Sequence, residues 1–295
     1  PLLPDTPLPL EADQVAFFWV TVEIPQDALP GHYTGTVTMT VNGLPIALPL
    51  ALDVWNFDLP PERHLNVTIW FNDGAMCAAH GVERFSKEYW RLLKVYAENM
   101  ARHRQNVILV PLDLIQLKSG FRKVKCDFDY FDRYVETFLN AGFTMLELSH
   151  LAYFGPDGWD GSEIVWRSFK VGEKETAGDN EELIAAVLGD LVLHLQEKGW
   201  LEVSAIHVAD EPSVNNLQSW KEHSALIGRV APGLRRIDAI EAEDFRGFLE
   251  IWVPKLQVIE PWKSPLRNAV ENGAELWFYT CCHPYGVYPN RFLDS

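Results

Sequence analysis

The sequence predicts an α/β fold, a (β/α)₈ barrel preceded by part of a small antiparallel β-sandwich. Residues 15–58 are rich in β-forming residues and show no helical periodicity. From Leu65 onward, apolar strands alternate with amphipathic helices, which is typical of parallel strands joined by helical crossovers. One of these strands ends abruptly in Asp210-Glu211-Pro212, and α/β barrels carry their catalytic groups at the C-terminal ends of the strands. Together these observations predict a barrel enzyme with an N-terminal appendage.

The N-terminal part is expected to contain strands at residues 15–24, 33–41 and 44–54. Asn42-Gly43 lies between the last two, and this dipeptide favours a tight β-hairpin turn. Because the chain begins with Pro1 rather than Met, we expect further strands of the sandwich to lie upstream.

The pair Pro60-Pro61 is expected to be a linker. We therefore divide the chain into a partial β-sandwich domain, residues 1–60, and a barrel catalytic domain, residues 61–295.

The second part should supply seven parallel strands, at residues 65–71, 106–111, 143–149, 203–209, 234–240, 251–253 and 275–280. Helices are expected at about residues 85–103, 128–141, 181–198 and 214–230, and a long loop rich in Gly and Trp at residues 152–179. After Thr280 there is room only for a loop and the start of a helix. We therefore expect the barrel to lack its last strand in this chain, and the chain to be a fragment of a longer protein.

Charge and composition narrow the class of partner. With 25 basic and 41 acidic residues the net charge is −16, which disfavours nucleic acid and anionic membrane surfaces. No apolar run approaches the ~18 residues that span a bilayer, and the N-terminus lacks the pattern of a signal peptide, so we expect no membrane insertion. Eleven tryptophans mildly favour a glycan or glycoconjugate ligand, although barrel cores also use tryptophan.

Metal and cofactor chemistry have little support in the sequence. The cysteines Cys77, Cys126, Cys281 and Cys282 form no CxxC pair, so neither a disulfide framework nor structural zinc is expected. No Gly-rich phosphate loop is present. We expect His207 to be a hydrogen-bonded barrel histidine rather than a metal ligand, because no second His or Cys joins it at metal-binding spacing. No cofactor is therefore expected.

The loops after the strands should open onto one face, which collects polar and aromatic side chains. The candidate substrate-binding residues are Trp70, Asn72, Asp73, His150, Trp252, Tyr279 and His283. Trp70 and Trp252 could stack on a sugar or equally pack in the core. Asn72 and Asp73 could bind sugar hydroxyls or form a turn with Gly74. A polar and aromatic cleft of this kind suits a sugar.

Asp210 and Glu211 are the candidate catalytic residues. Two carboxyl groups in one cleft push their pKa values apart, and acetal hydrolysis needs an acid beside an anion. A retaining glycosidase also needs a nucleophile ~5 Å from the acid. The last strand ends in Tyr279-Thr280 without a carboxylate, and Glu275 at its start would face the other end of the barrel. The simpler alternative is that Asp210 and Glu211 are a solvated strand end that opens the next helix.

A 2-acetamido group on the substrate can replace the missing nucleophile. Its carbonyl oxygen attacks the anomeric carbon and forms an oxazoline-like intermediate. Such a mechanism needs one general acid/base and one carboxylate that orients the acetamido N–H, and Asp210 and Glu211 can supply both. Tyr279 could hydrogen-bond the acetamido oxygen. The sequence therefore favours retaining, substrate-assisted hydrolysis of a terminal β-linked 2-acetamido sugar.

Several motifs resemble the catalytic region of glycoside hydrolase family 123. They are residues 209–212 (ADEP), residues 277–284 (WFYTCCHP) and, in the N-terminal part, residues 30–35 (PGHYTG) and 54–60 (VWNFDLP). The family's described activity is exo-β-N-acetylgalactosaminidase, so the resemblance implies N-acetylgalactosamine as the first choice of sugar. It also implies that Asp210 orients the acetamido group and that Glu211 is the general acid/base.

Two other functions stay open on the sequence. Glu241, at the end of the strand at 234–240, is the best alternative carboxylate, and a position ~5 Å from Glu211 would make the protein a two-carboxylate retaining glycosidase. The missing eighth strand would also suit a non-catalytic carbohydrate-binding module. Turnover of sugars without an acetamido group would identify the former, and sugar binding without turnover the latter.

Overall fold

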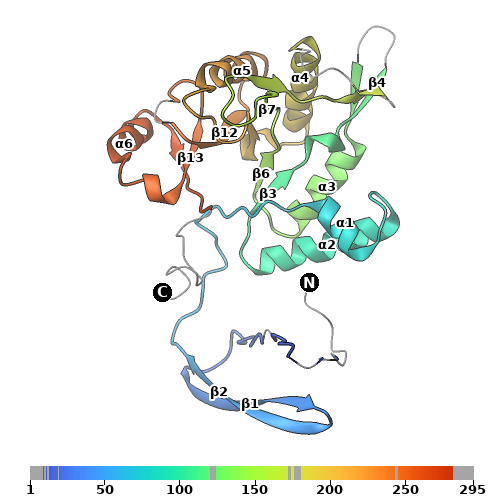
Figure 1. Ribbon diagram of the computed structural model, residues 1–295, viewed down its shortest axis with the longest axis vertical. Helices are drawn as coiled ribbons and strands as arrows, with labels where there is room; N and C mark the ends of the chain where they lie inside the picture. Colours follow the sequence, from blue (N-terminus) through green and yellow to red (C-terminus); the bar gives the residue numbers. More distant parts are fainter. Residues whose placement is uncertain are drawn as a thin grey trace. The chain divides into compact units, whose positions relative to one another are not determined.

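A computed structural model describes residues 9, 11, 13–18, 20–119, 124–171, 174–175, 181–242 and 245–281 (Figure 1). The chain divides into two compact units, Pro1–Glu62 and Arg63–Ser295. The strands that carry the candidate catalytic residues all belong to the second unit.

The first unit contains a long antiparallel hairpin of β1 (Gly31–Val41) and β2 (Leu44–Val54). Its turn places Asn42 and Gly43 at φ of 51° and 79°, the left-handed region that a tight hairpin requires, so the hairpin expected from Asn-Gly is confirmed. The expected strand at 15–24 is wrong for the residues described there, which pair with no other strand. A strand forms only where a partner takes up its backbone N–H and C=O groups. The wider β-sandwich stays a prediction.

The second unit is built on a parallel sheet whose strand order, β3-β6-β11-β12-β13-β14, follows the order of the chain. Its strands are β3 (Val107–Val110), β6 (Met145–Leu148), β11 (Ser204–His207), β12 (Arg235–Ile240), β13 (Ile251–Pro254) and β14 (Glu275–Leu276). A parallel bridge between Thr68 and Val107 extends the sheet beyond β3, and a bridge between Lys255 and Tyr279 continues the pairing of β13 with β14. The C-terminal ends of all these strands therefore lie at one edge of the sheet.

Helices surround this sheet in chain order (Figure 1). They are α1 (Asp73–His80), α2 (Lys87–Arg102), α3 (Asp129–Asn140), α4 (Glu181–Glu197), α5 (Leu217–Val230) and α6 (Lys263–Glu271), with short 3₁₀ turns at Leu112–Leu114, Leu201–Val203 and Leu256–Val258. The helices bury large aromatic side chains against the sheet, among them Phe131, Phe138 and Trp220. None of the described helices is long and apolar enough to cross a membrane.

The fold is a mixed α/β structure with an open sheet, and the closed (β/α)₈ barrel is not present in the part of the chain that the structure describes. The expected strand at 65–71 is reduced to the single bridge at Thr68. Asn106 explains this, because its side chain accepts a hydrogen bond from the Val67 N–H (2.7 Å) and donates one to the Leu65 carbonyl (3.2 Å). A side chain thus occupies backbone groups that a strand ladder would have used.

Two small groups of short strands lie at the C-terminal edge of the sheet. One is a sheet of β4 (Gln116–Ser119), β5 (Val124–Asp127), β9 (Lys170–Val171) and β10 (Lys174–Glu175). The other is a hairpin of β7 (Ala152–Phe154) and β8 (Ile164–Trp166). The loop expected at 152–179 therefore contains short strands, whose lengths of two or three residues lie below what a periodic pattern can reveal.

Candidate active site

Asp210 and Glu211 lie three and four residues after the end of β11, the third strand of the sheet in chain order. Backbone hydrogen bonds hold this strand end on one side: the Leu151 N–H donates to the His207 carbonyl (3.2 Å) and the Ala152 N–H to the Val208 carbonyl (2.8 Å). The loop after β6 is thereby fixed against the segment that leads to the two carboxylates.

Beneath this strand end lies a buried cluster of Glu147, His207 and Asp238, which we call the inner charge group. His207 Nε2 is 2.6 Å from Glu147 Oε1, and His207 Nδ1 is 2.7 Å from Asp238 Oδ1. Glu147 also accepts hydrogen bonds from Thr68 Oγ1 (2.7 Å) and Trp70 Nε1 (3.0 Å). The expectation that His207 is a hydrogen-bonded histidine is confirmed.

The protonation of the inner charge group follows from these contacts. Burial alone would lower the pKa of His207, but its hydrogen bonds to Asp238 and Glu147 raise that pKa to about 10. Burial would raise the pKa of Glu147, but the bonds from His207, Thr68 and Trp70 outweigh it and lower that pKa. Burial raises the pKa of Asp238, although the hydrogen bond from His207 acts against this. At neutral pH His207 is therefore an imidazolium that donates one hydrogen bond to Glu147 and one to Asp238.

Asp238 connects the inner charge group to the candidate catalytic pair. Its Oδ2 accepts hydrogen bonds from the Ala209 N–H (2.9 Å) and from Trp220 Nε1 (2.8 Å). Ala209 immediately precedes Asp210, so a fully buried carboxylate fixes the backbone at the point where the pair begins.

Asp210 lies partly buried above this group. Burial raises the pKa of Asp210 to about 6, and the negative charges of Asp238 and Glu211 act in the same direction. Its carboxyl group therefore changes charge in the range where many hydrolases work, which is a property of functional carboxylates.

Glu211 has an unusual backbone. Its φ of 45° lies in the left-handed region, which side chains other than glycine rarely adopt. A residue that precedes a proline usually has an extended backbone, and Glu211 before Pro212 departs from that rule. Two contacts hold the strained conformation: Trp159 Nε1 donates to the Glu211 carbonyl (3.1 Å), and the Glu241 N–H donates to the Pro212 carbonyl (3.3 Å). Strain of this kind clusters at functional sites.

The Glu211 side chain belongs to a second cluster, with Glu241, Lys255 and Tyr279, which we call the outer charge group. The Tyr279 hydroxyl forms a very short hydrogen bond with Glu211 and a longer one, 3.3 Å, with Glu241 Oε1. Lys255 Nζ lies 3.5 Å from Glu211 Oε1 and makes a very short ion pair with Glu241. Glu211 and Glu241 thus share one hydroxyl and one ammonium group and are close neighbours.

Burial and contacts within the outer charge group shift the pKa values of Tyr279 and Lys255. Burial and then the hydrogen bond to Glu211 raise the pKa of Tyr279, so its hydroxyl stays protonated and acts as a donor. Burial would lower the pKa of Lys255, but Glu241 and Glu211 raise it, so Lys255 stays cationic. The cluster therefore offers a bound substrate one hydroxyl, one cation and two carboxylates.

The other sequence-predicted residues divide into those near the pair and those elsewhere. Trp70 and His150 pack against His207, with ring centroids 5.5 and 4.3 Å from its imidazole, and the Trp70 ring is 45% exposed. Burial and the adjacent cations hold the pKa of His150 well below its usual value, so His150 is neutral. Trp70 is thus placed where a sugar ring could reach it.

Asn72, Asp73 and Trp252 have structural contacts instead. Asn72 caps α1 by accepting a hydrogen bond from the Ala75 N–H (2.9 Å). Asp73 is buried and accepts hydrogen bonds from Arg84 and Tyr89, each at 2.7 Å. Trp252 is only 1% exposed, so its ring is not open to a sugar as the sequence had allowed. His283 lies outside the described residues.

Sequence reasoning missed Glu147, Asp238, Lys255 and Trp159. Glu147 and Asp238 had a signal that was not used, since each is an acidic residue inside an otherwise apolar strand segment. Trp159 stands at the tip of the β7–β8 hairpin with 44% of its surface exposed, beside Glu211. It is a better placed aromatic platform than Trp252.

Geometry also brings one ring nitrogen each of His150 and His207 and one oxygen of Asp238 within 4.8 Å of one another, a spacing that could hold a metal ion. Both His207 nitrogens, however, donate to carboxylates, and the raised pKa keeps that ring protonated. A protonated imidazole has no lone pair for a metal. These residues therefore do not fit a metal centre.

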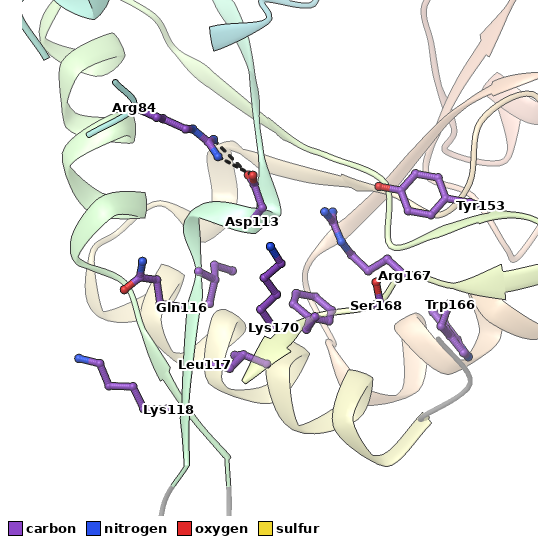
Figure 2. Close-up of a pocket in the computed structure, with 12 residues that line it drawn as sticks. Arg84, Asp113, Gln116, Leu117, Lys118, Tyr153, Trp166, Arg167, Ser168 and Lys170 are labelled. Atoms are coloured by element: carbon purple, nitrogen blue, oxygen red, sulfur yellow. Dashed lines mark hydrogen bonds and ion pairs between the residues drawn. The ribbon is translucent and has the colours of Figure 1, made fainter. Parts of the chain in front are cut away.

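A pocket of about 900 Å³ opens near the C-terminal ends of β3 and β6 (Figure 2). Asp113, Tyr153 and Arg167 are among its lining residues, whereas Asp210 and Glu211 are not. The candidate catalytic pair therefore does not line this pocket.

The chain also matches a known family of proteins. The family model described as "Glycoside hydrolase 123, catalytic domain" matches residues 70–295. The chain belongs to glycoside hydrolase family 123. It is therefore a glycoside hydrolase domain, as the motifs around Asp210 and Tyr279 led us to expect, and no curated protein sequence matches it.

Among solved structures, the chain is similar to a family 123 glycoside hydrolase from Clostridium perfringens, described in connection with glycolipid glycan hydrolysis. The TM-score is 0.66 at 16% identity, over 90% of this chain and 52% of that one, so the chain spans about half the length of that protein. A GH10 endoxylanase from a sugarcane soil metagenome gives a TM-score of 0.37 at 14% identity, over 66% of this chain and 62% of that one. A family 5 glycoside hydrolase from Bacteroides vulgatus gives 0.39 at 11% identity, over 63% and 44%.

Proposed function

We propose that this chain is the catalytic part of a retaining glycosidase that removes a terminal β-linked 2-acetamido sugar, with N-acetylgalactosamine as the first choice. One observation carries the proposal: Asp210 and Glu211 are adjacent in sequence but differ in surroundings. Asp210 lies near the buried Asp238, and the pKa of Asp210 is raised to about 6. Glu211 instead contacts Tyr279 and Lys255. Two neighbouring carboxyl groups in unlike environments are suited to two different roles.

In the first chemical step the acetamido carbonyl oxygen bonds to the anomeric carbon while the bond from that carbon to the leaving oxygen breaks. Glu211, in its protonated form, gives its proton to the leaving oxygen. Asp210, as a carboxylate, accepts a hydrogen bond from the acetamido N–H and stabilises the positive charge that develops on the new five-membered ring. A raised pKa of about 6 leaves Asp210 ionised at neutral pH, as this role requires.

In the second step water attacks the anomeric carbon and the bond to the acetamido oxygen breaks. Glu211, now a carboxylate, takes a proton from the attacking water. Two displacements at one carbon restore the original β configuration. The Tyr279 hydroxyl is a suitable donor to the acetamido oxygen, because its raised pKa keeps it protonated.

Trp159 and Trp70 are suited to hold the sugar ring. Each residue is close to half exposed; Trp159 donates to the Glu211 carbonyl, and Trp70 packs against His207. His150, neutral and packed on His207, can donate or accept a hydrogen bond from the same side.

We also propose that the sheet is part of a (β/α)₈ barrel, with residues 1–60 contributing to a β-sandwich. The strand order that follows the chain and the membership of family 123 support the barrel. The words "glycolipid glycan hydrolysis" used of the Clostridium perfringens protein make glycolipid glycans the first natural substrates to try.

The direct test is hydrolysis of three nitrophenyl glycosides: the β-N-acetylgalactosaminide, the β-N-acetylglucosaminide and the plain β-galactoside. Turnover only where the acetamido group is present supports the assisted mechanism, and the faster epimer identifies the sugar. Turnover of the plain galactoside would contradict it. Binding of these sugars without any turnover would favour a carbohydrate-binding module.

A second candidate is the two-carboxylate mechanism, because Glu241 shares Tyr279 and Lys255 with Glu211. Its ion pair with Lys255 would have to loosen before Glu241 could attack an anomeric carbon. Glu241→Gln separates the two candidates: it should abolish turnover if Glu241 is the nucleophile, and leave the acetamido substrate hydrolysed if it is not.

A further inference from the structure

We infer that the pocket lined by Arg167 and Lys170 binds an anionic group, a carboxylate or a sulfate ester, carried by a sugar of the substrate glycan. The inference rests on the proposed function and extends it from the terminal sugar to its neighbour. The first support is charge. Four cationic side chains line the pocket, Arg84, Lys118, Arg167 and Lys170, against the single carboxylate of Asp113, in a chain whose net charge is −16.

Two of these cations are already neutralised. Arg84 forms ion pairs with Asp73 (2.7 Å) and Asp113 (2.6 Å), and Lys118 pairs with Asp127. Arg167 and Lys170 form no ion pair with any residue that the structure describes. Figure 2 shows both of them extending toward the same space, which Asp113 and the Tyr153 hydroxyl also face. The pocket therefore presents a net positive charge at its centre.

Arg167 is held in place before any ligand arrives. Its Nη1 donates to the His150 carbonyl (2.9 Å) and to Ser149 Oγ (3.3 Å), and its guanidinium lies 5.4 Å from the Phe169 ring centroid. A planar guanidinium matches the oxygens of carboxylates and sulfates.

The pocket also has features that suit a sugar. The Tyr153 ring is 49% exposed on its wall and can stack on a pyranose face. A volume of about 900 Å³ lies within the range of small-molecule sites. An inorganic anion alone would need far less space.

The pocket is coupled to the catalytic pair through the β7–β8 hairpin. The Ala152 N–H donates to the Val208 carbonyl, two residues before Asp210, and Tyr153 is the next residue in β7. The Arg167 N–H donates to the Leu151 carbonyl (2.8 Å) at the base of the hairpin. Trp159 at its tip reaches the Glu211 carbonyl. The same hairpin thus contacts Glu211 and lines the pocket. A binding site for the next sugar of a glycan would need such a connection to the catalytic pair.

Calorimetric titration of the full chain tests this directly and does not depend on turnover. The probes are 3′-sialyllactose against lactose, for a carboxylate, and 6-sulfated N-acetylglucosamine against N-acetylglucosamine, for a sulfate. We expect at least one acidic sugar to bind about tenfold more tightly than its neutral parent, with the advantage falling as salt rises. The pair that shows the larger ratio identifies the anionic group.

Two variants locate the effect. Lys170→Ala should lower the ratio of acidic to neutral affinity severalfold, and so should Arg167→Lys, which keeps the charge but loses the planar fork. Lys94→Ala, which removes an exposed lysine from α2, is the matched control and should leave the ratio unchanged. Equal affinities for acidic and neutral sugars, or equal effects of Lys170→Ala and Lys94→Ala, would overturn the inference. An acid preference in a protein that hydrolyses no nitrophenyl glycoside would instead overturn the proposed function.

Discussion

Two groups of charged side chains lie near the C-terminal ends of the parallel strands, and they are built in opposite ways. The inner charge group of Glu147, His207 and Asp238 is buried, and its histidine donates to a carboxylate on each side. The outer charge group of Glu211, Glu241, Lys255 and Tyr279 is partly exposed, and its two carboxylates share one hydroxyl and one ammonium group.

This difference indicates a division of labour. Every polar group of the inner cluster has a fixed partner, so it holds the strand ends in one arrangement. In the outer cluster two carboxylates compete for the same partners, so polar groups of a substrate can replace those contacts at little cost. We infer that the inner group serves stability and position, whereas the outer group and Asp210 serve chemistry.

The largest expected effect is on the outer group. Glu211→Gln should lower kcat/KM for an acetamido disaccharide by about 10³-fold, since proton transfer to a poor leaving group contributes about 10²- to 10⁴-fold. A substrate with an activated dinitrophenyl leaving group should lose far less, because it departs without a proton.

The control for that variant is Glu260→Gln, at an exposed glutamate paired with Lys263. Unfolding midpoints should be alike for both variants. Equal losses on good and poor leaving groups would remove Glu211 from the role of general acid.

The inner group should show its largest effect in stability. His207→Ala leaves two buried carboxylates without their shared cation, and breaking a buried ion pair costs about 3 to 5 kcal/mol of unfolding free energy. Urea denaturation measures it, with His80→Ala, at an exposed histidine bonded to Tyr96, as the matched control. A loss below about 1 kcal/mol, typical of surface pairs, would contradict the structural role of the inner group.

A smaller effect is expected in the pH dependence of stability. The pKa of His207 is raised in the folded state to about 10, above the value of about 6.5 for a free histidine. The protonated ring therefore contributes stability that is fully present below pH 6.5 and is lost as the pH rises through about 10.

This contribution is read as the difference in unfolding free energy between the unsubstituted chain and His207→Gln, whose side chain does not titrate. The difference should shrink steadily from pH 6.5 to pH 10. A constant difference over that range would show that His207 is not charged in the folded protein.

Features that depend on local signals could be predicted from the sequence, whereas features that depend on contacts between distant segments could not. Helices α2 to α5 begin and end within about three residues of their predicted bounds, because apolar periodicity and capping residues are local signals. The position of Asp210-Glu211 at a strand end was also a local signal. The strand at 65–71 was overestimated, because the Asn106 side chain that takes over its backbone bonds comes from a distant segment.

The acidic residues of the inner group had a sequence signal, but their assembly around His207 could not be predicted, for a similar reason. Glu147 and His207 are 60 residues apart, and Asp238 lies another 31 residues on, so only the sheet register brings them together. The contact of Glu241 with Tyr279 likewise depends on the fold, because it joins residues that follow two different strands, β12 and β14. The sequence shows which residues are carboxylates that could take part in catalysis, whereas the residues that each carboxylate contacts depend on the fold.

The measurement that tests the central claim most directly is the pH profile of kcat/KM for the nitrophenyl β-N-acetylgalactosaminide. With the pKa of Asp210 at about 6, the rate should rise as the pH increases through 6 and Asp210 becomes ionised. In Asp210→Asn this rise should disappear and the rate at pH 7 should fall by at least about 10²-fold, while the exposed-residue control Asp129→Asn behaves like the unsubstituted chain. A rise through pH 6 that persists in Asp210→Asn, at a nearly unchanged rate, would contradict the account.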